Sequence, residues 1–228
     1  VQDQRHKILD ESQRTNAVLG DIIIEPVRKP DTGNNFRTIN NQNGNWGLDR
    51  IDQFNLPLDG RYHFSRSGSG VDVVIFSSGI FPNHREFLFS QGTSRVETIY
   101  DYRFELEPNH PEALSFSDPN WQAYWGVDFA GHGTHLASIV GGNTCGVANG
   151  VKLWSVKIFN ERYETNSQRL IRGLEETLAW HNAKTNSRPT LVLLSYSDFI
   201  VERAPGIRQA VNDLSAAGVS IISTAGNM

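Results

Sequence analysis

A histidine between two glycines is the residue of this sequence best suited to chemistry. His132 stands in the run GHGTHLA at residues 131–137, which leads into a small-residue, apolar segment that predicts a helix. A histidine at a helix entrance can face a cleft and act as a general base, and flanking glycines let another backbone approach closely. Periodicity alone leaves a purely structural histidine equally open.

His135 adds a second kind of chemistry. It follows His132 at the i, i+3 spacing that places two metal ligands on one helix face. A third ligand is not evident nearby, so a metal hydrolase stays a minor alternative, and we expect no metal and no cofactor.

A parallel sheet must position these residues. Apolar runs rich in β-branched residues predict strands, and apolar residues at helical spacing predict two helices, the first capped by Ser167. Their alternation predicts an α/β fold, a doubly wound, mainly parallel sheet with helices on both faces and its chemistry at the carboxyl ends of the strands. The strands are expected at 71–77, 151–159, 190–195 and 219–223, and the helices at 167–184 and 206–217.

The chain divides into two unequal parts. Residues 1–45 are polar and turn-rich, with one short predicted strand at 22–24, and form an N-terminal arm and linker. The domain proper covers residues 46–228. Within it, residues 90–128 fit the alternation poorly and predict a surface insertion anchored by aromatic side chains.

Composition excludes several classes of function. A net charge of −4 provides no basic field for a phosphate backbone, so no nucleic-acid partner is expected. No apolar run approaches the length of a membrane span, and the single cysteine, Cys145, excludes a disulfide framework within the chain.

Five segments, in order, resemble one known family. Together they resemble the subtilisin-like serine proteases (peptidase S8), most closely their proteinase K branch. The resemblance implies a serine endopeptidase fold, with His132 as general base and Asn227 as a donor to the oxyanion. The segments are 45–51 (NWGLDRI), 131–137 (GHGTHLA), 146–148 with 151–159, 191–197 (LVLLSYS) and 223–227 (STAGN).

The first departure from the family falls on the catalytic aspartate. The family pattern is Val-Ile-Asp-Ser/Thr-Gly, whereas residues 74–80 read VIFSSGI and place Ser77 at the aspartate position. A hydroxyl can still orient the imidazole, but it cannot compensate the imidazolium charge, and the loss of that charge in a related triad costs about 10⁴-fold, or roughly 5 to 6 kcal/mol. Asp72 lies about 16 Å up the same strand and cannot substitute.

The second departure concerns the cleft. Where the family has Ser-Leu-Gly-Gly along the bound peptide, this chain has Ser195, Tyr196, Ser197 and Asp198. Their side chains are expected to narrow or block the substrate-binding cleft, because glycines there let the substrate backbone approach closely. The opposite, glycine-rich wall is replaced by YETN at residues 163–166.

The third departure is the absence of the Gly-Thr-Ser segment that carries the family's nucleophile, because the sequence stops at Met228. The C-terminal part of the fold is therefore expected to be missing, which leaves an apolar sheet face for a protein partner or complementary chain to cover. A carboxylate from the insertion, such as Asp118 or Asp128, would make a substitute triad arguable if it lay beside His132.

These departures lead to two hypotheses. The first is a catalytically inactive homologue, a pseudopeptidase, that acts as a binding or structural subunit. The alternative is the histidine-bearing chain of a two-chain subtilisin-like serine endopeptidase, with the serine on a second polypeptide. The resemblance also implies an extracellular or secretory location and suggests that residues 1–45 hold a propeptide remnant.

Overall fold

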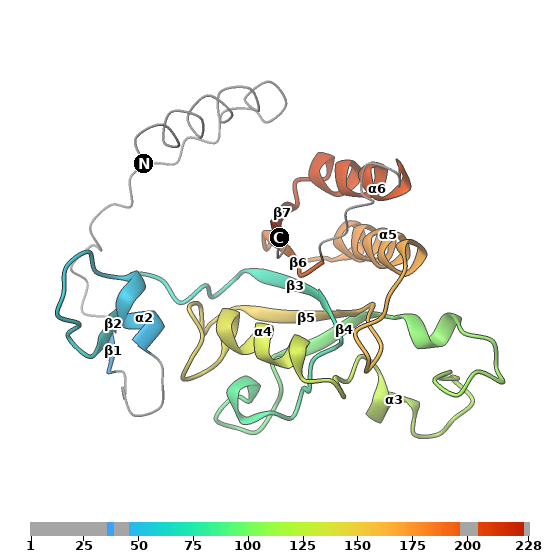
Figure 1. The fold of residues 1–228 in the computed structure, drawn as a ribbon, viewed down its shortest axis with the longest axis horizontal. Coiled ribbons are helices and arrows are strands. Elements are labelled where there is room, and N and C mark those ends of the chain that lie inside the picture. The colour runs from blue at the N-terminus through green and yellow to red at the C-terminus, as the bar shows by residue number, and fades with distance from the viewer. Residues whose placement is uncertain (1–35, 39–45, 197–204, 226–228) are drawn as a thin grey trace, which may run out of the picture.

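The computed structural model describes residues 36–38, 46–196 and 205–225 of the chain (Figure 1). Most of the predicted arm, including the strand expected at 22–24, lies outside these residues. Asn227, Ser197 and Asp198 also lie outside them.

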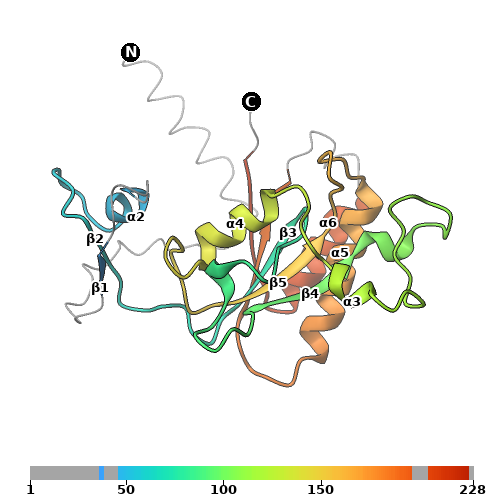
Figure 2. The same cartoon turned by 90° about the horizontal axis from the view of Figure 1, so that it is seen from below.

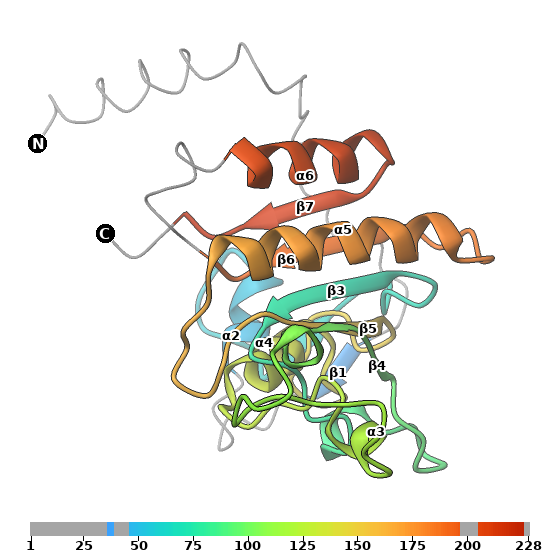
Figure 3. The same ribbon diagram turned by 90° about the vertical axis from the view of Figure 1, so that its right-hand side faces the viewer.

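A five-stranded parallel sheet forms the centre of the fold. Its order is β4-β5-β3-β6-β7, so the chain moves to one edge after β3 and returns to build the other edge (Figure 3). The ends of β3 and β6 are therefore adjacent, and their onward connections run in opposite directions, which is where α/β sheets form clefts. The strands are β3 (Asp72–Ser77), β4 (Val96–Asp101), β5 (Lys152–Lys157), β6 (Thr190–Leu194) and β7 (Ser220–Ser223).

Helices cover both faces of this sheet, which confirms the predicted fold class. Helices α5 (Ser167–Ala183) and α6 (Pro205–Ala216) lie on one face, and α4 (His132–Gly141) lies on the other, over β3 and β5 (Figures 1 and 2). Within the described residues, every helix is too short or too polar to span a bilayer.

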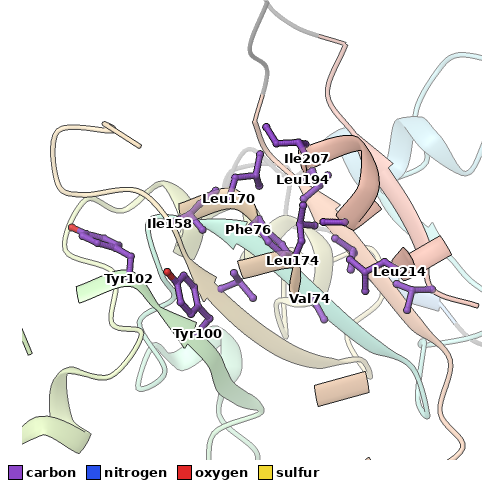
Figure 4. Close-up of a cluster of buried hydrophobic side chains, with 14 residues drawn as sticks. Val74, Phe76, Tyr100, Tyr102, Ile158, Leu170, Leu174, Leu194, Ile207 and Leu214 are labelled. Atoms are coloured by element: carbon purple, nitrogen blue, oxygen red, sulfur yellow. The ribbon is translucent and has the colours of Figure 1, made fainter. Parts of the chain in front are cut away.

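Strand β3 is buried along its whole length because it is covered on both faces. Val74 and Phe76 point into a core that also holds Leu174 of α5 and Leu214 of α6 (Figure 4). The alternate residues of β3 point the other way and pack beneath α4. The predicted continuous apolar strand is thus the central strand of the sheet.

Two details of the sequence prediction are wrong. Residues 96–101 are not part of a surface insertion but form β4, an edge strand parallel to β5; its polar, half-exposed residues hid the strand pattern. The cap of α5 is Asn166, whose side chain accepts a hydrogen bond from the Arg169 amide, rather than Ser167.

Short elements complete the described chain. Beside the sheet, β1 and β2 pair antiparallel next to α2, and the Tyr62 hydroxyl ties this unit to the Val147 carbonyl oxygen at 3.1 Å. The elements are β1 (Phe36–Thr38), α2 (Trp46–Ile51), β2 (Arg61–His63), η2 (Arg85–Phe87), η3 (Tyr102–Glu105) and α3 (Trp121–Tyr124).

Glycine is required where α4 meets the loop after β3. A Cβ on Gly133 would lie 1.9 Å from the Gly79 carbonyl oxygen and 3.1 Å from the Ser77 Cβ. Gly79 itself has φ +107°, a conformation that side chains rarely adopt. These glycines let the start of α4 approach the end of β3.

Gly133→Ala should therefore lower the free energy of unfolding by about 3 kcal/mol, because the methyl group forces α4 away from β3. Urea denaturation followed by circular dichroism measures the change. Gly47→Ala in α2 is the matched control, since its Cβ would meet nothing within 4 Å. Equal effects of the two substitutions would contradict the packing argument.

Candidate functional site

His132 and Ser77 come together as the sequence predicts. Ser77 ends β3, and His132 begins α4 directly after Gly131, whose φ of +93° turns the chain into the helix. The Ser77 hydroxyl and His132 Nδ1 are hydrogen-bonded at 2.9 Å, and Ser77 is buried. Among the described residues, Ser77 is the only hydrogen-bond partner of the imidazole.

Asp128 lies near this pair, but its carboxylate binds groups of the surrounding turn and not the imidazole. Its carboxylate accepts hydrogen bonds from the Ser78 hydroxyl at 2.9 Å, the Gly131 amide at 2.8 Å, and the Thr134 amide and hydroxyl at 2.8 and 2.6 Å. Burial alone would raise the pKa of Asp128, but these hydrogen bonds outweigh it and hold that pKa below its ordinary value. Asp128 therefore fixes the turn into α4.

The other carboxylates considered from the sequence are engaged elsewhere. Asp118 accepts a hydrogen bond from the Asn120 amide at 2.8 Å. Asp72 sits at the opposite end of β3, bonded to the Trp154 indole at 3.1 Å and paired with Lys184 and Arg188. In the described part of the chain, no carboxylate stands in for the missing aspartate.

A buried lysine lies next to Ser77 on the neighbouring strand. Lys157 is the register partner of Ser77, is almost fully buried, and donates a hydrogen bond from Nζ to the Ser78 carbonyl oxygen. Burial, together with the charge of Arg103, lowers the pKa of Lys157 to about 8. A positive rather than a negative group thus lies close to the aspartate position, a feature that the sequence analysis missed.

A cleft of about 700 Å³ opens beside His132 at the carboxyl ends of β5 and β6. The predicted wall residues Ser195 and Tyr196 line it, as do residues of the opposite wall. Phe159, which ends the apolar run of β5, was not predicted as a cleft residue. The lining residues are His132, Phe159, Tyr163, Glu164, Thr165, Ser195 and Tyr196.

Tyr163 closes one side of this cleft. It has φ +61°, the only positive φ of a non-glycine residue in the described ranges. Its hydroxyl donates to the Ala130 carbonyl oxygen at 2.9 Å, and its ring meets the His132 ring edge to face, with centroids 5.8 Å apart. A residue in the left-handed region costs conformational energy, and these contacts hold it there.

His135 does not share this cleft. It lines a separate cavity of about 730 Å³ with Glu86 and Cys145. Throughout the described ranges, no three His, Cys, Asp or Glu side chains are placed to hold one metal ion. The metal hydrolase alternative therefore gains no third ligand from the geometry.

Comparisons with known proteins agree with the arrangement of the sheet, the histidine helix and the cleft. The sequence model of the subtilase family matches residues 56–228. The chain belongs to the subtilase family. It is 34% identical over 182 residues to an extracellular serine proteinase of Thermus sp. (strain Rt41A) and 32% identical over 188 residues to the alkaline serine exoprotease A of Vibrio alginolyticus.

The similarity covers most of this subtilase chain but only part of each relative. The two alignments cover 80% and 82% of the chain, and 37% and 30% of the relatives. The crystal structure of a cold adapted subtilisin-like serine proteinase has a TM-score of 0.59 at 28% identity, over 80% of this chain and 56% of the other. The chain therefore spans about a third to a half of the length of these proteins.

The buried lysine predicts a pH dependence of stability. Because the pKa of Lys157 falls from 10.5 to about 8 on folding, the unfolded chain binds more protons at alkaline pH, so stability rises as the pH passes from 8 towards 10.5. The unfolding free energy of the wild type, measured relative to Lys157→Met, should increase by roughly 1 kcal/mol between pH 7 and 9. A difference that does not change with pH would contradict the buried ammonium.

Proposed function

We infer that this chain is a catalytically inactive subtilisin-like serine peptidase homologue that acts as a binding or structural subunit. The observation that carries the proposal is the 2.9 Å hydrogen bond between the Ser77 hydroxyl and His132 Nδ1. The hydroxyl orients the ring but carries no charge. When the histidine takes a proton from a nucleophile, no negative charge therefore stabilises the imidazolium. The loss of that charge lowers the rate about 10⁴-fold.

The surroundings of Ser77 support the same proposal. Lys157 holds a buried positive group on the adjacent strand, and Asp128 is committed to the turn before α4. A second positive charge on the imidazole would be disfavoured in such a site. The cleft, in contrast, is kept open beside His132 and suits binding better than catalysis.

An open apolar strip of the sheet supports a role within an assembly. Leu193 and Ile222 are register partners on β6 and β7 that lie on the α4 side of the sheet, beyond the reach of the helix. Ile222 is half exposed, as is Ile139 on α4. We propose that a protein partner or a complementary polypeptide segment covers this strip.

The proposed location is outside the cell, or in the secretory pathway that leads there. It rests on the family and on the name of the Thermus relative, an extracellular serine proteinase.

The alternative function is the histidine-bearing part of a two-chain serine endopeptidase. The open strip favours it, because a second polypeptide packed against Leu193 and Ile222 would lie next to α4 and could bring a serine to His132. That serine would attack the peptide carbonyl while His132 takes its proton.

Fluorophosphonate labelling separates the two functions. The native protein and its copurifying partners are treated with a fluorophosphonate probe. Neither the wild type nor Ser77→Asp should be labelled, because a restored carboxylate cannot act without a nucleophile. Labelling of a partner serine in the wild type, abolished by His132→Ala, would instead establish the two-chain enzyme.

Charge placed on the open strip should disrupt the assembly. Sedimentation of the native protein should show a species heavier than 25.5 kDa, and Ile222→Lys should reduce it to the single chain while circular dichroism shows that the chain is still folded. Ser215→Lys adds the same charge to an exposed site on α6, across the sheet, and should leave the assembly intact. A wild type that stays a soluble 25.5 kDa monomer at all concentrations would count against a covering partner.

A further inference from the structure

We propose that the cleft beside His132 binds a cationic guanidinium or ammonium group, as carried by an arginine or lysine side chain of a peptide. The proposal rests on the proposed function in one respect: it treats the cleft as a binding site. The ligand class follows from three features of the described lining residues: three are aromatic, one carries a carboxylate, and none is a lysine or arginine.

Aromatic rings contribute three of the seven lining residues. Tyr163 comes from the loop before α5, while Phe159 and Tyr196 follow β5 and β6 and lie with ring centroids 6.1 Å apart. The faces of such rings carry negative electrostatic potential and attract a cation, and arginine most often.

Among the described residues that line the cleft, Glu164 is the only acidic one and none is a lysine or arginine. Its Oε2 accepts a hydrogen bond from Asn160 Nδ2 at 2.8 Å, whereas Oε1 accepts none from the described residues. One carboxylate oxygen is thus fixed in place while the other can receive a donor from a guanidinium group.

The loop that carries these groups is ordered before any ligand arrives. The Asn160 side chain accepts hydrogen bonds from the amides of Arg162 and Glu164, at 3.0 and 2.9 Å. The Tyr163 hydroxyl ties the same loop to Ala130. A pre-ordered wall loses little conformational freedom on binding.

Charges around the cleft also favour a cation. Residues 104–151, which include His132, contain five acidic residues and no lysine or arginine. Arg162 and Glu161 line a neighbouring cavity instead, and Glu164 lies between the two because it lines both. The buried Lys157 donates its hydrogen bond to the Ser78 carbonyl oxygen and does not line the described part of the cleft, so the charged side chain that an approaching cation meets there is Glu164.

Titration by nuclear magnetic resonance tests the proposal on the full 228-residue chain. Blocked peptides with a central arginine, lysine or isosteric norleucine are compared with butylguanidine. We expect the amides of Tyr163, Glu164 and Ser195 to shift, with arginine binding about tenfold more tightly than norleucine. Butylguanidine binding as tightly as the arginine peptide would assign the site to free cations rather than peptides, and norleucine matching arginine would overturn the cation site.

Matched variants locate the binding site. Glu164→Gln should weaken arginine binding about five- to tenfold, whereas Glu161→Gln, in the same loop but on the other cavity, should leave it unchanged. If the two substitutions weakened binding equally, the attraction would depend on the overall charge of the protein and not on Glu164. That result would contradict the proposed site. These titrations measure binding alone, so their result is independent of fluorophosphonate labelling. A protein that is labelled and also binds arginine would refute the proposed inactivity but support the cation site.

Discussion

The close approach of α4 to the end of β3 is the constraint on which the site depends. Gly133 has room only because it lacks a side chain facing the Gly79 carbonyl oxygen, and the Ser78 hydroxyl links the two elements by donating to Asp128 and accepting from the Gly133 amide. This packing carries the His132 ring to the Ser77 hydroxyl. The position of His132 is thus maintained by the close packing of Gly133 and by the hydrogen bonds of Ser78.

The site orients His132 without placing a negative charge beside its inner nitrogen. The Ser77 hydroxyl that orients His132 is neutral, and the neighbouring strand adds the buried Lys157. In a triad, the orienting group must also stabilise the imidazolium, and a hydroxyl meets only the first requirement. Tyr163 lines the cleft on this side, with its ring centroid 5.8 Å from that of His132.

The sequence predicted the sheet well because buried parallel strands carry a strong local signal. The runs at β3 and β6, and the helix at α5, lie where periodicity placed them. Strand β4 was missed because three of its six residues are polar and it pairs with only one strand, at the edge of the sheet. The Ser77–His132 contact followed from the family pattern, whereas the left-handed conformation of Tyr163 and the burial of Lys157 depend on tertiary contacts that no local pattern reports.

In the described part of the chain, a hydroxyl and no carboxylate contacts the inner nitrogen of His132. The most direct measurement is a crystal structure of the native protein together with whatever polypeptide covers β6 and β7. We expect Ser77 Oγ within hydrogen-bond distance of Nδ1 and every carboxylate of the assembly beyond 4 Å from that nitrogen. A carboxylate hydrogen-bonded to Nδ1 in place of Ser77, from this chain or from the covering one, would contradict it.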